Sequence, residues 1–247
     1  LFMIASVLLW AGKLSGILNG VDYAAWDPAT DPQIPARYGP GDLKGKAVCK
    51  AELVRLLGLP SSAAARPIVG VVSRLAGQKG FDLVAGALDE LFKRDFVLVV
   101  LGTGEAKIQD ALAAAQKVHA DRFGLKIAFD DKVARTIYAG SDMFLIPSRY
   151  EPCGLTQMYS LKYGTIPVVR ATGGLDDTIR EFDPAAETGN GFKFEAYTQE
   201  ALLGCLDRAL ARWKDKAAWA RLIANAMAED FSWNRSARAY LDLYRSL

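Results

Sequence analysis

The sequence places two cations at the ends of a short loop that follows an apolar run. The run "PIVGVV" leads into "SRLAGQKG", which holds Ser73, Arg74 and Lys79. An arginine offers a planar fork to phosphate oxygens and a lysine offers a mobile point charge, so the two can bind one anion together. Two solvated surface cations are the other interpretation. Parallel α/β sheets bind ligands at the carboxyl ends of their strands, and this position favours anion binding.

Glycines follow the next apolar run, "FVLVVLGTGE". Gly102 and Gly104 permit a tight turn and the close approach of a ligand. The segment lacks the glycine pattern of a dinucleotide fingerprint, because Lys107 occupies the last glycine position. These residues alone leave two interpretations open, an ordinary turn and one wall of a nucleotide site.

A third loop, in "PSRYEPCGLTQ", combines a carboxylate with a predicted helix start. The free N–H groups of Gly154, Leu155 and Thr156 are expected to face an anion at the beginning of that helix. Glu151 would repel a phosphate in contact with it, so it is expected to bind sugar hydroxyls or to face developing positive charge. Cys153 has no histidine partner, and its thiol is interpreted as packing rather than as a nucleophile.

A fourth loop repeats this pattern in "TIPVVRATGGLDDTI", where Gly173 and Gly174 form a candidate oxygen-binding turn. The following Asp176 and Asp177 could suggest a metal. Two adjacent carboxylates with no further ligand in view are more typical of a helix N-terminus. No metal site is therefore expected.

Composition argues against several classes of protein. The 247 residues include 30 Lys and Arg and 28 Asp and Glu, and a net charge of +2 gives no general argument for binding nucleic acid or a membrane. Three scattered cysteines predict no disulfide framework and favour a reducing cytoplasm. The single histidine, His119, lies in a charged stretch and is expected at the surface, which argues against a Ser-His-Asp triad.

The opening segment "LFMIASVLLWAG" is unusually apolar. It is shorter than the roughly 20 residues of a membrane span and lacks the features of a secretory signal. We expect a buried helix or a segment whose partner surface is missing. The chain does not begin with methionine, so a fragment of a longer protein is expected.

The order of segments predicts how the four loops are held together. From residue 67, apolar runs alternate with amphipathic stretches, which predicts an α/β fold with a doubly wound parallel sheet. The predicted strands occupy residues 67–75, 96–104, 125–129, 142–148 and 165–169, and the predicted helices 44–60, 81–95, 105–123, 132–141, 155–164 and most of the chain from 199. The Pro-, Gly- and Asp-rich segment 15–42 is expected to be a long ordered loop.

At these motifs the chain resembles a known family. In this order, "SRLAGQKG", "LGTGE", "PSRYEPCGLTQMYSLKYGTIPVV" and "TGGLDDTI" resemble the C-terminal half of bacterial glycogen synthases and plant starch synthases. "GILNGVDYAAWDPATD" and "FSWNRSARAYLDLYRSL" resemble the opening and closing segments of that half. The resemblance implies a GT-B fold, in which two Rossmann-like domains face each other across a cleft. It also implies transfer of glucose from ADP-glucose to an α-1,4-glucan, with retained configuration and no metal or other cofactor.

The same resemblance implies roles for individual residues. Arg74 and Lys79 match the pair that holds the distal phosphate and stabilises the departing ADP, and Glu151 matches the carboxylate beside the donor glucose. Tyr159 stands where many other retaining glycosyltransferases have a second glutamate, which favours the glycogen and starch synthases. The residues expected to bind the nucleotide sugar are Ser73, Gly102, Gly104, Phe129 (a loose match to an adenine-side aromatic), Cys153, Gly154, Leu155, Thr156, Gly173 and Gly174.

We therefore expect an apolar segment and linker at 1–42, a nucleotide-sugar-binding domain at 43–230 and a closing helix at 231–247. The family's N-terminal domain, with its Lys-Thr-Gly-Gly-Leu loop, has no match here, so this chain is expected to transfer little glucose alone. Two alternatives remain: a related enzyme using another nucleotide sugar, and a non-catalytic nucleotide-binding module. The expected location is the cytoplasm in bacteria or the plastid in plants or algae.

Overall fold

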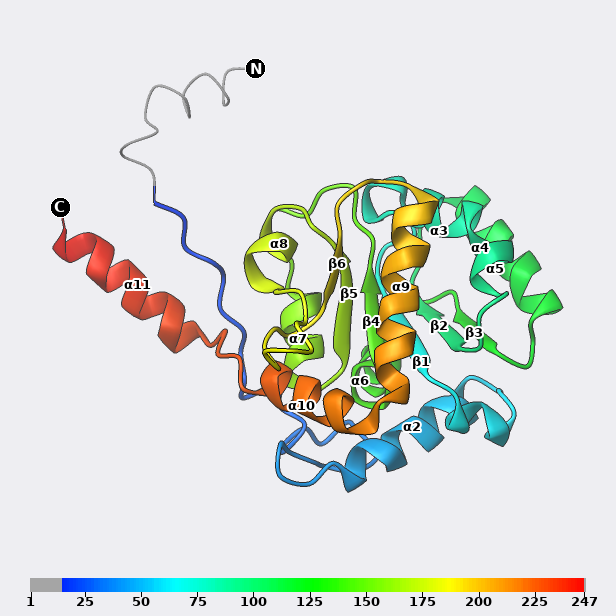
Figure 1. Cartoon of the computed structure of the whole chain (residues 1–247), viewed down its shortest axis with the longest axis horizontal. Coiled ribbons are helices and arrows are strands. Elements are labelled where there is room, and N and C mark those ends of the chain that lie inside the picture. The colour runs from blue at the N-terminus through cyan, green and yellow to red at the C-terminus, as the bar shows by residue number, and fades with distance from the viewer. Residues whose placement is uncertain (1–14, 247) are drawn as a thin grey trace, which may run out of the picture.

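The computed structural model describes residues 15–246 and contains a six-stranded parallel sheet (Figure 1). The strands are β1 Ile68–Val72, β2 Val97–Leu101, β3 Phe123–Lys126, β4 Met143–Ile146, β5 Ile166–Arg170 and β6 Phe192–Phe194. Their order is β3-β2-β1-β4-β5-β6, and every neighbouring pair is parallel. This is the order of a doubly wound, Rossmann-like sheet, so the predicted fold class is confirmed. The interpretation of the apolar opening segment concerns residues outside the described part.

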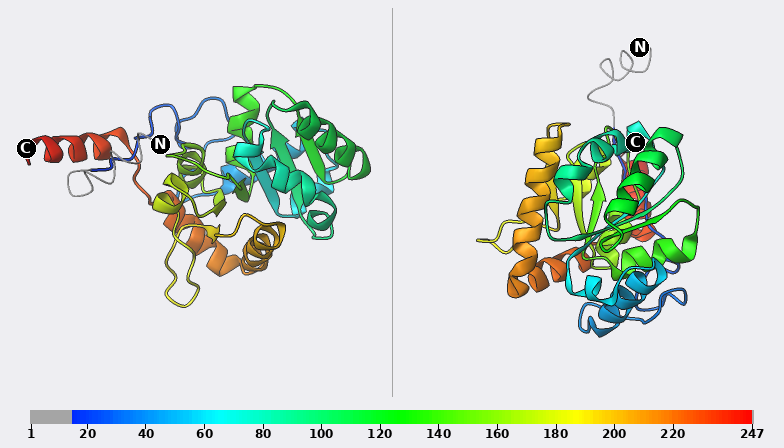
Figure 2. Two further views of the ribbon diagram at one scale, coloured as in Figure 1. Left: turned by 90° about the horizontal axis from the view of Figure 1, so that it is seen from above. Right: turned by 90° about the vertical axis from the view of Figure 1, so that its right-hand side faces the viewer.

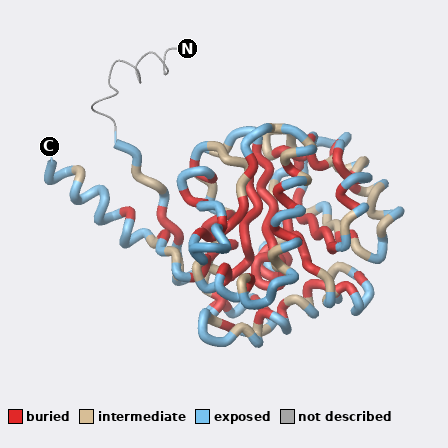
Figure 3. The backbone as a smooth tube through the Cα atoms, in the orientation of Figure 1, coloured by how far each residue is buried: buried red, intermediate tan, exposed pale blue. Residues whose placement is uncertain are grey.

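The strands form the core because their aliphatic side chains are buried on both faces. β2 and β4 are buried along their whole length, and the central strands are the most continuous buried segments of the chain (Figure 3). Strands covered on both faces are expected to read as unbroken apolar runs, which is how they were predicted. The edge strand β6 was not predicted, because its sequence "FKF" is too short to stand out as such a run.

Helices cover both faces of the sheet (Figure 2). The connections from β1 through β3 contain α3 Phe81–Gly86, α4 Leu88–Leu91 and α5 Ala106–Val118, and those from β3 through β5 contain α6 Asp131–Gly140 and α7 Thr156–Lys162. These two series cross the sheet in opposite directions, so right-handed crossovers place them on opposite faces. The remaining elements of the body are α2 Lys44–Leu56, η2 Ser61–Ala65, η3 Gly77–Lys79, α8 Gly174–Thr178, α9 Gln199–Lys214 and α10 Lys216–Met227.

Several predicted boundaries were wrong, among them those of the helices that follow β1 and β2. The predicted helix 81–95 is divided at Ala87, whose N–H is shared between two carbonyls, and it ends at Leu91. α5 ends at Val118 rather than at residue 123, so β3 begins at Phe123 and pairs with Leu98 of β2. His119 terminates α5, and its half-buried ring lies 4.0 Å from the Phe92 ring, so it is not simply a solvated surface residue.

The segment 15–42 contains no helix or strand, as predicted, but it is firmly attached to the body. Asp31 is buried and accepts hydrogen bonds from Arg135 at 3.0 Å and from the Tyr163 hydroxyl at 2.5 Å. A buried carboxylate is tolerated when it is paired and hydrogen-bonded in this way. The network fixes the linker against α6 and α7. The division of the chain into three units stays a prediction.

The last helix, α11 Trp233–Arg245, projects from the body beside the start of the described chain (Figures 1 and 2). Ser236 donates a hydrogen bond to the Leu18 carbonyl at 2.8 Å, and Val21 donates to the Phe231 carbonyl at 2.7 Å. Ser236 is the one buried residue of α11. Within residues 15–246, no helix combines the length and the apolar character needed to cross a membrane.

Candidate functional site

The site lies where the strand order reverses, at the carboxyl ends of β1 and β4. These two strands are neighbours, with Val69 opposite Met143 and Gly70 opposite Phe144. Their helical connections leave in opposite directions, which opens a crevice between the two loops. The loop after β1 carries Arg74 and Lys79, and the loop after β4 carries Glu151. The sequence therefore brings all three predicted catalytic residues to one junction.

Lys79 and Glu151 meet across this junction. Lys79 Nζ lies 2.5 Å from Glu151 Oε2, and the Ser148 hydroxyl donates to the same oxygen at 3.2 Å. The two charged side chains are 21% and 11% exposed, so water screens their interaction less than that of a surface pair. Both residues were predicted from the sequence, but their direct pairing and the hydrogen bond from Ser148 were not.

Arg74 is exposed and has no carboxylate within 4.0 Å in the described chain. It donates to the Gln78 side-chain oxygen at 2.9 Å, while the Gln78 amide donates to the Tyr150 carbonyl at 3.2 Å. Neutral partners leave the full charge of Arg74 available to an anion. Gln78 thus links the guanidinium to the β4 loop, a role that sequence reasoning missed.

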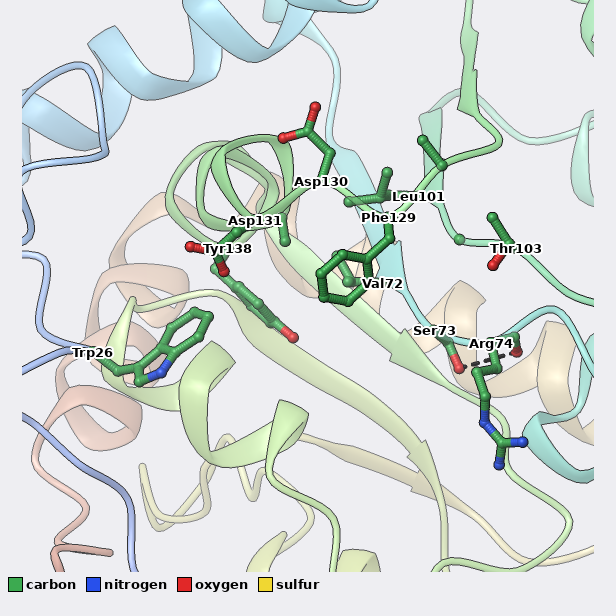
Figure 4. A pocket seen from close by; sticks show the side chains of 13 residues that line it. Trp26, Val72, Ser73, Arg74, Leu101, Thr103, Phe129, Asp130, Asp131 and Tyr138 are labelled. Atoms are coloured by element: carbon green, nitrogen blue, oxygen red, sulfur yellow. Dashed lines mark hydrogen bonds between the residues drawn. The ribbon is translucent and has the colours of Figure 1, made fainter.

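Two cavities adjoin at Arg74. One of about 210 Å³ is lined by Arg74, Lys79, Glu151 and Thr156, among others. The second, of about 330 Å³, is mainly apolar and lies between the ends of β1 and β2 and the start of α6 (Figure 4). Ser73 and Arg74 line both cavities. A charged cavity joined to an apolar one suits a ligand with an ionic part and a flat apolar part.

The apolar cavity includes residues that sequence reasoning missed. Trp26 of the linker and Tyr138 of α6 form one side of it, and Thr103 lies on the opposite side (Figure 4). Trp26 stacks on Tyr159 with ring centroids 4.1 Å apart, and the Arg135 guanidinium lies 4.1 Å from the Trp26 ring centroid. A tryptophan inside a polar loop is the sequence signal that could have revealed this wall. Phe129 is 97% exposed at the same cavity.

The glycines predicted to bind ligand also have a packing role. A Cβ on Gly102 would lie 1.9 Å from the Ser73 carbonyl oxygen, and one on Gly104 would lie 2.1 Å from that of Leu75. The loop after β2 therefore lies directly on the loop after β1, and Leu75 donates to the Thr103 carbonyl at 2.9 Å. Gly102 lines the apolar cavity and Gly104 does not.

The second glycine pair joins the loops after β4 and β5. A Cβ on Gly173 would lie 2.3 Å from the Glu151 carbonyl oxygen, and one on Gly174 would lie 2.0 Å from that of Cys153. Gly174 N–H also donates to the Glu151 carbonyl at 3.0 Å. These contacts hold the loop after β5 against the backbone of the loop that carries Glu151. Asp176 lies in the first turn of α8, as the helix-start interpretation predicted.

The turn before α7 presents free backbone donors. Gly154 has φ +73°, and in the described chain the N–H groups of Gly154, Leu155 and Thr156 donate to no acceptor. The side chain of Thr156 lines the charged cavity, whereas that of Leu155 is exposed. The thiol of Cys153 is half-buried and lies 3.4 Å from the Gly154 carbonyl, which agrees with a packing role.

The fold and this site define a Rossmann-like α/β domain whose switch point holds a crevice lined by Arg74, Lys79 and Glu151. Residues 61–226 match the family described as glycosyl transferases group 1, and the chain belongs to this family.

Curated relatives narrow the comparison. The chain is 55% identical over 237 residues to a glycogen synthase of Anaeromyxobacter dehalogenans, covering 96% of this chain and 49% of that protein. It is 50% identical over 234 residues to a glycogen synthase of Koribacter versatilis, covering 95% of this chain and 48% of that protein. The resemblance to glycogen synthases is confirmed, and the chain spans about half the length of these relatives.

A solved structure gives the same result. The catalytic domain of Starch Synthase IV from Arabidopsis thaliana, bound to ADP and acarbose, superposes with a TM-score of 0.90 and 38% sequence identity. The match covers 98% of this chain and 50% of that one. More distant structures, such as the sucrose-phosphate synthase of Thermosynechococcus elongatus at 22% identity and a TM-score of 0.66, share the fold.

Proposed function

We propose that this chain is the donor-binding half of a retaining glycosyltransferase that moves glucose from ADP-glucose to the non-reducing end of an α-1,4-glucan. The observation that carries the proposal is the convergence of Arg74, Lys79 and Glu151 between two adjoining cavities at the switch point. The high identity to glycogen synthases supports the choice of reaction.

The two cavities match the two ends of a nucleotide sugar. The apolar cavity, with Tyr138 and Phe129 on its walls, suits a flat purine, which gains by burial against aromatic rings. Arg74 lies where the cavities meet and suits the diphosphate, because a guanidinium binds phosphate oxygens through parallel hydrogen bonds. The glucose then falls in the charged cavity beside Glu151.

The charges suit the transition state of glycosyl transfer. Breaking the bond between glucose and phosphate leaves negative charge on ADP and positive charge on the sugar. Arg74 and Lys79 stabilise the first, and the Glu151 carboxylate stabilises the second. Fixed charges that match both developing charges lower the barrier more than they stabilise the ground state.

We propose that binding needs no metal, since two side-chain cations face the diphosphate. Within residues 15–246, no group of three or more His, Cys, Asp and Glu side chains is placed to hold a metal ion. Adding EDTA to the ADP titration described below is expected to leave the dissociation constant unchanged within about twofold, whereas loss of binding would show that a divalent cation takes part.

We also propose that a second Rossmann-like domain completes the site across the crevice. The chain spans about half of its relatives, and α11 exposes Trp233, Tyr240, Leu241 and Tyr244, an aromatic face suited to contact such a domain. Bacterial relatives favour the cytoplasm over the plastid as the location.

Calorimetric titration of the chain with ADP, and with UDP as the competing donor nucleotide, tests the proposal. ADP is expected to bind more tightly than UDP, and Arg74→Ala or Lys79→Ala is expected to weaken ADP binding by roughly fivefold or more. Lys93→Ala is the control, because Lys93 is an exposed lysine paired with Glu90 on α4. Tighter binding of UDP would favour a related enzyme with another donor. Absence of any nucleotide binding would contradict a preformed donor site.

A further inference from the structure

Three residues outside both cavities connect the loop of Lys79 to the loop of Glu151. Asp82 lies in the first turn of α3, three positions after Lys79, and Arg149 lies two positions before Glu151. Arg149 Nη2 donates to Asp82 Oδ2 at 2.8 Å. The third member is Tyr197, between β6 and α9, whose hydroxyl donates to Asp82 Oδ1 at 2.5 Å. We call Asp82, Arg149 and Tyr197 the clasp.

The clasp is a built network rather than a chance surface pair. The Arg149 guanidinium lies 4.3 Å from the Tyr197 ring centroid. Arg149 therefore contacts the ring of Tyr197 and also pairs with Asp82, the acceptor of the Tyr197 hydroxyl. Arg149 N–H donates to the Gln78 carbonyl at 2.9 Å. Arg170 of β5 donates to the Arg149 carbonyl at 2.6 Å and to the Glu195 carbonyl at 3.0 Å. The loops after β1, β4 and β6 and the end of β5 are thereby joined at the carboxyl end of the sheet.

The charges of the clasp agree with its geometry. Two opposing effects act on the pKa of the Asp82 carboxyl. Burial by itself would raise it, but the hydrogen bonds from Tyr197 and Arg149 lower it by more, so the pKa is below its usual value. Burial and the hydrogen bond to Asp82 raise the pKa of Tyr197 to about 12, so the hydroxyl keeps its proton. Near neutral pH the carboxylate therefore accepts from both partners.

We infer that the clasp positions Lys79 against the donor phosphate by fixing the spacing between the loops after β1 and β4. None of the three residues lines either cavity, so an effect of the clasp on the geometry of binding has to pass through a residue that does. Lys79 is the nearest such cation in sequence, because η3, which ends at Lys79, leads through Gly80 directly into the helix of Asp82. This inference rests on the proposed function.

Two substitutions test the clasp on the 247-residue chain, with ADP as the probe. Tyr197→Phe removes the hydroxyl and keeps the ring under Arg149, and Asp82→Asn keeps the shape and removes the charge. Each is expected to raise the ADP dissociation constant roughly fivefold to tenfold. The direction of the change in ADP affinity for Asp82→Asn distinguishes two explanations. Removing a negative charge near an anion site would by simple electrostatics tighten binding, whereas loss of positioning weakens it.

The Lys79→Ala background distinguishes positioning from a general structural effect. If the clasp acts through Lys79, Tyr197→Phe is expected to change ADP affinity by less than about twofold when Lys79 is already alanine. Asp207→Asn is the matched control, because it breaks the ion pair with Arg94 at a similar exposure, 51% for Asp207 against 44% for Asp82. Melting temperatures of all variants identify any that fail to fold.

The outcomes separate this inference from the proposed function. If wild type binds ADP and both clasp variants bind equally well or more tightly, the clasp has no positioning role. An equal loss with and without Lys79 would also overturn it. If wild type binds no ADP, the proposed function fails and the inference fails with it.

Discussion

At the scale of single residues, a phosphate and the Glu151 carboxylate compete for Lys79, because Lys79 forms an ion pair with Glu151. A phosphate that binds Lys79 has to replace a carboxylate held at 2.5 Å, and it also approaches the negative charge of Glu151. Arg74 faces no such competitor in the described chain, since its partner is the neutral Gln78 side chain. In the proposed function the two cations therefore have different tasks: Arg74 is expected to attract the diphosphate, and Lys79 is expected to exchange Glu151 for a phosphate oxygen.

Glu151→Gln is expected to tighten ADP binding. The substitution frees Lys79 and removes repulsion of the diphosphate, so the ADP dissociation constant is expected to fall about threefold to tenfold. Calorimetric titration measures this change. Glu90→Gln, which breaks the exposed pair with Lys93, is expected to leave ADP affinity unchanged. Weaker ADP binding by Glu151→Gln would show that the carboxylate assists nucleotide binding instead of opposing it.

A second residue, Lys46 of α2, is expected to make the free energy of unfolding of this chain depend on pH. Its ammonium is buried and donates to the Ala139 and Tyr163 carbonyls and to the Thr165 hydroxyl. Burial lowers the pKa of Lys46 to about 7. The unfolded lysine keeps its ordinary pKa of about 10.4, so between these values the unfolded state binds one more proton than the folded state.

The free energy of unfolding is therefore expected to rise with pH from about 7 to about 10 by up to 1.4 kcal/mol per pH unit from this group. Urea unfolding of wild type and Lys46→Met over this range isolates the contribution as the difference between the two slopes. Parallel curves would show that Lys46 titrates alike in both states.

At the scale of elements, glycines allow two pairs of loops to pack closely: the loops after β1 and β2, and the loops after β4 and β5. The contact of Gly174 with the Cys153 carbonyl predicts that Gly174→Ala costs about 1–3 kcal/mol of unfolding free energy, because backbone has to move. Gly204 of α9 is the matched control: a Cβ there meets nothing within 4 Å, and Gly204→Ala is expected to stabilise the chain by about 0.5–1 kcal/mol. Urea unfolding measures both changes, and an unchanged stability of Gly174→Ala would contradict the loop packing.

The elements that could be predicted from sequence alone are those with a clear local pattern of apolar and polar residues. Five strands were identified because unbroken apolar runs are typical of a buried parallel sheet, and Arg74, Lys79 and Glu151 were singled out because each follows such a run. The short β6 and the break at Ala87 leave no comparable pattern. Contacts across the fold were not predictable: the clasp joins Asp82 to Arg149 across 67 positions and to Tyr197 across 115. No local period encodes such pairs.

At the scale of the whole molecule, the crevice lies at the surface of the Rossmann-like body, between the loops after β1 and β4. The first residues of the described chain and α11 run side by side away from that body (Figures 1 and 2), and the exposed face of α11 has aromatic side chains with little to cover them in the described chain. An arrangement of this kind suits a body that works against a second domain. In the proposed function, ADP binds to residues of this chain, and transfer to a glucan also requires the second domain proposed above.

A crystal structure of this chain with ADP would give the distance from Lys79 Nζ to the Glu151 carboxylate in the nucleotide-bound state. We expect the adenine in the cavity beside Tyr138 and Phe129, the diphosphate on Arg74, and Lys79 moved from Glu151 to the distal phosphate. ADP bound elsewhere, or bound in the crevice with the Lys79–Glu151 bond still at 2.5 Å, would contradict this expectation.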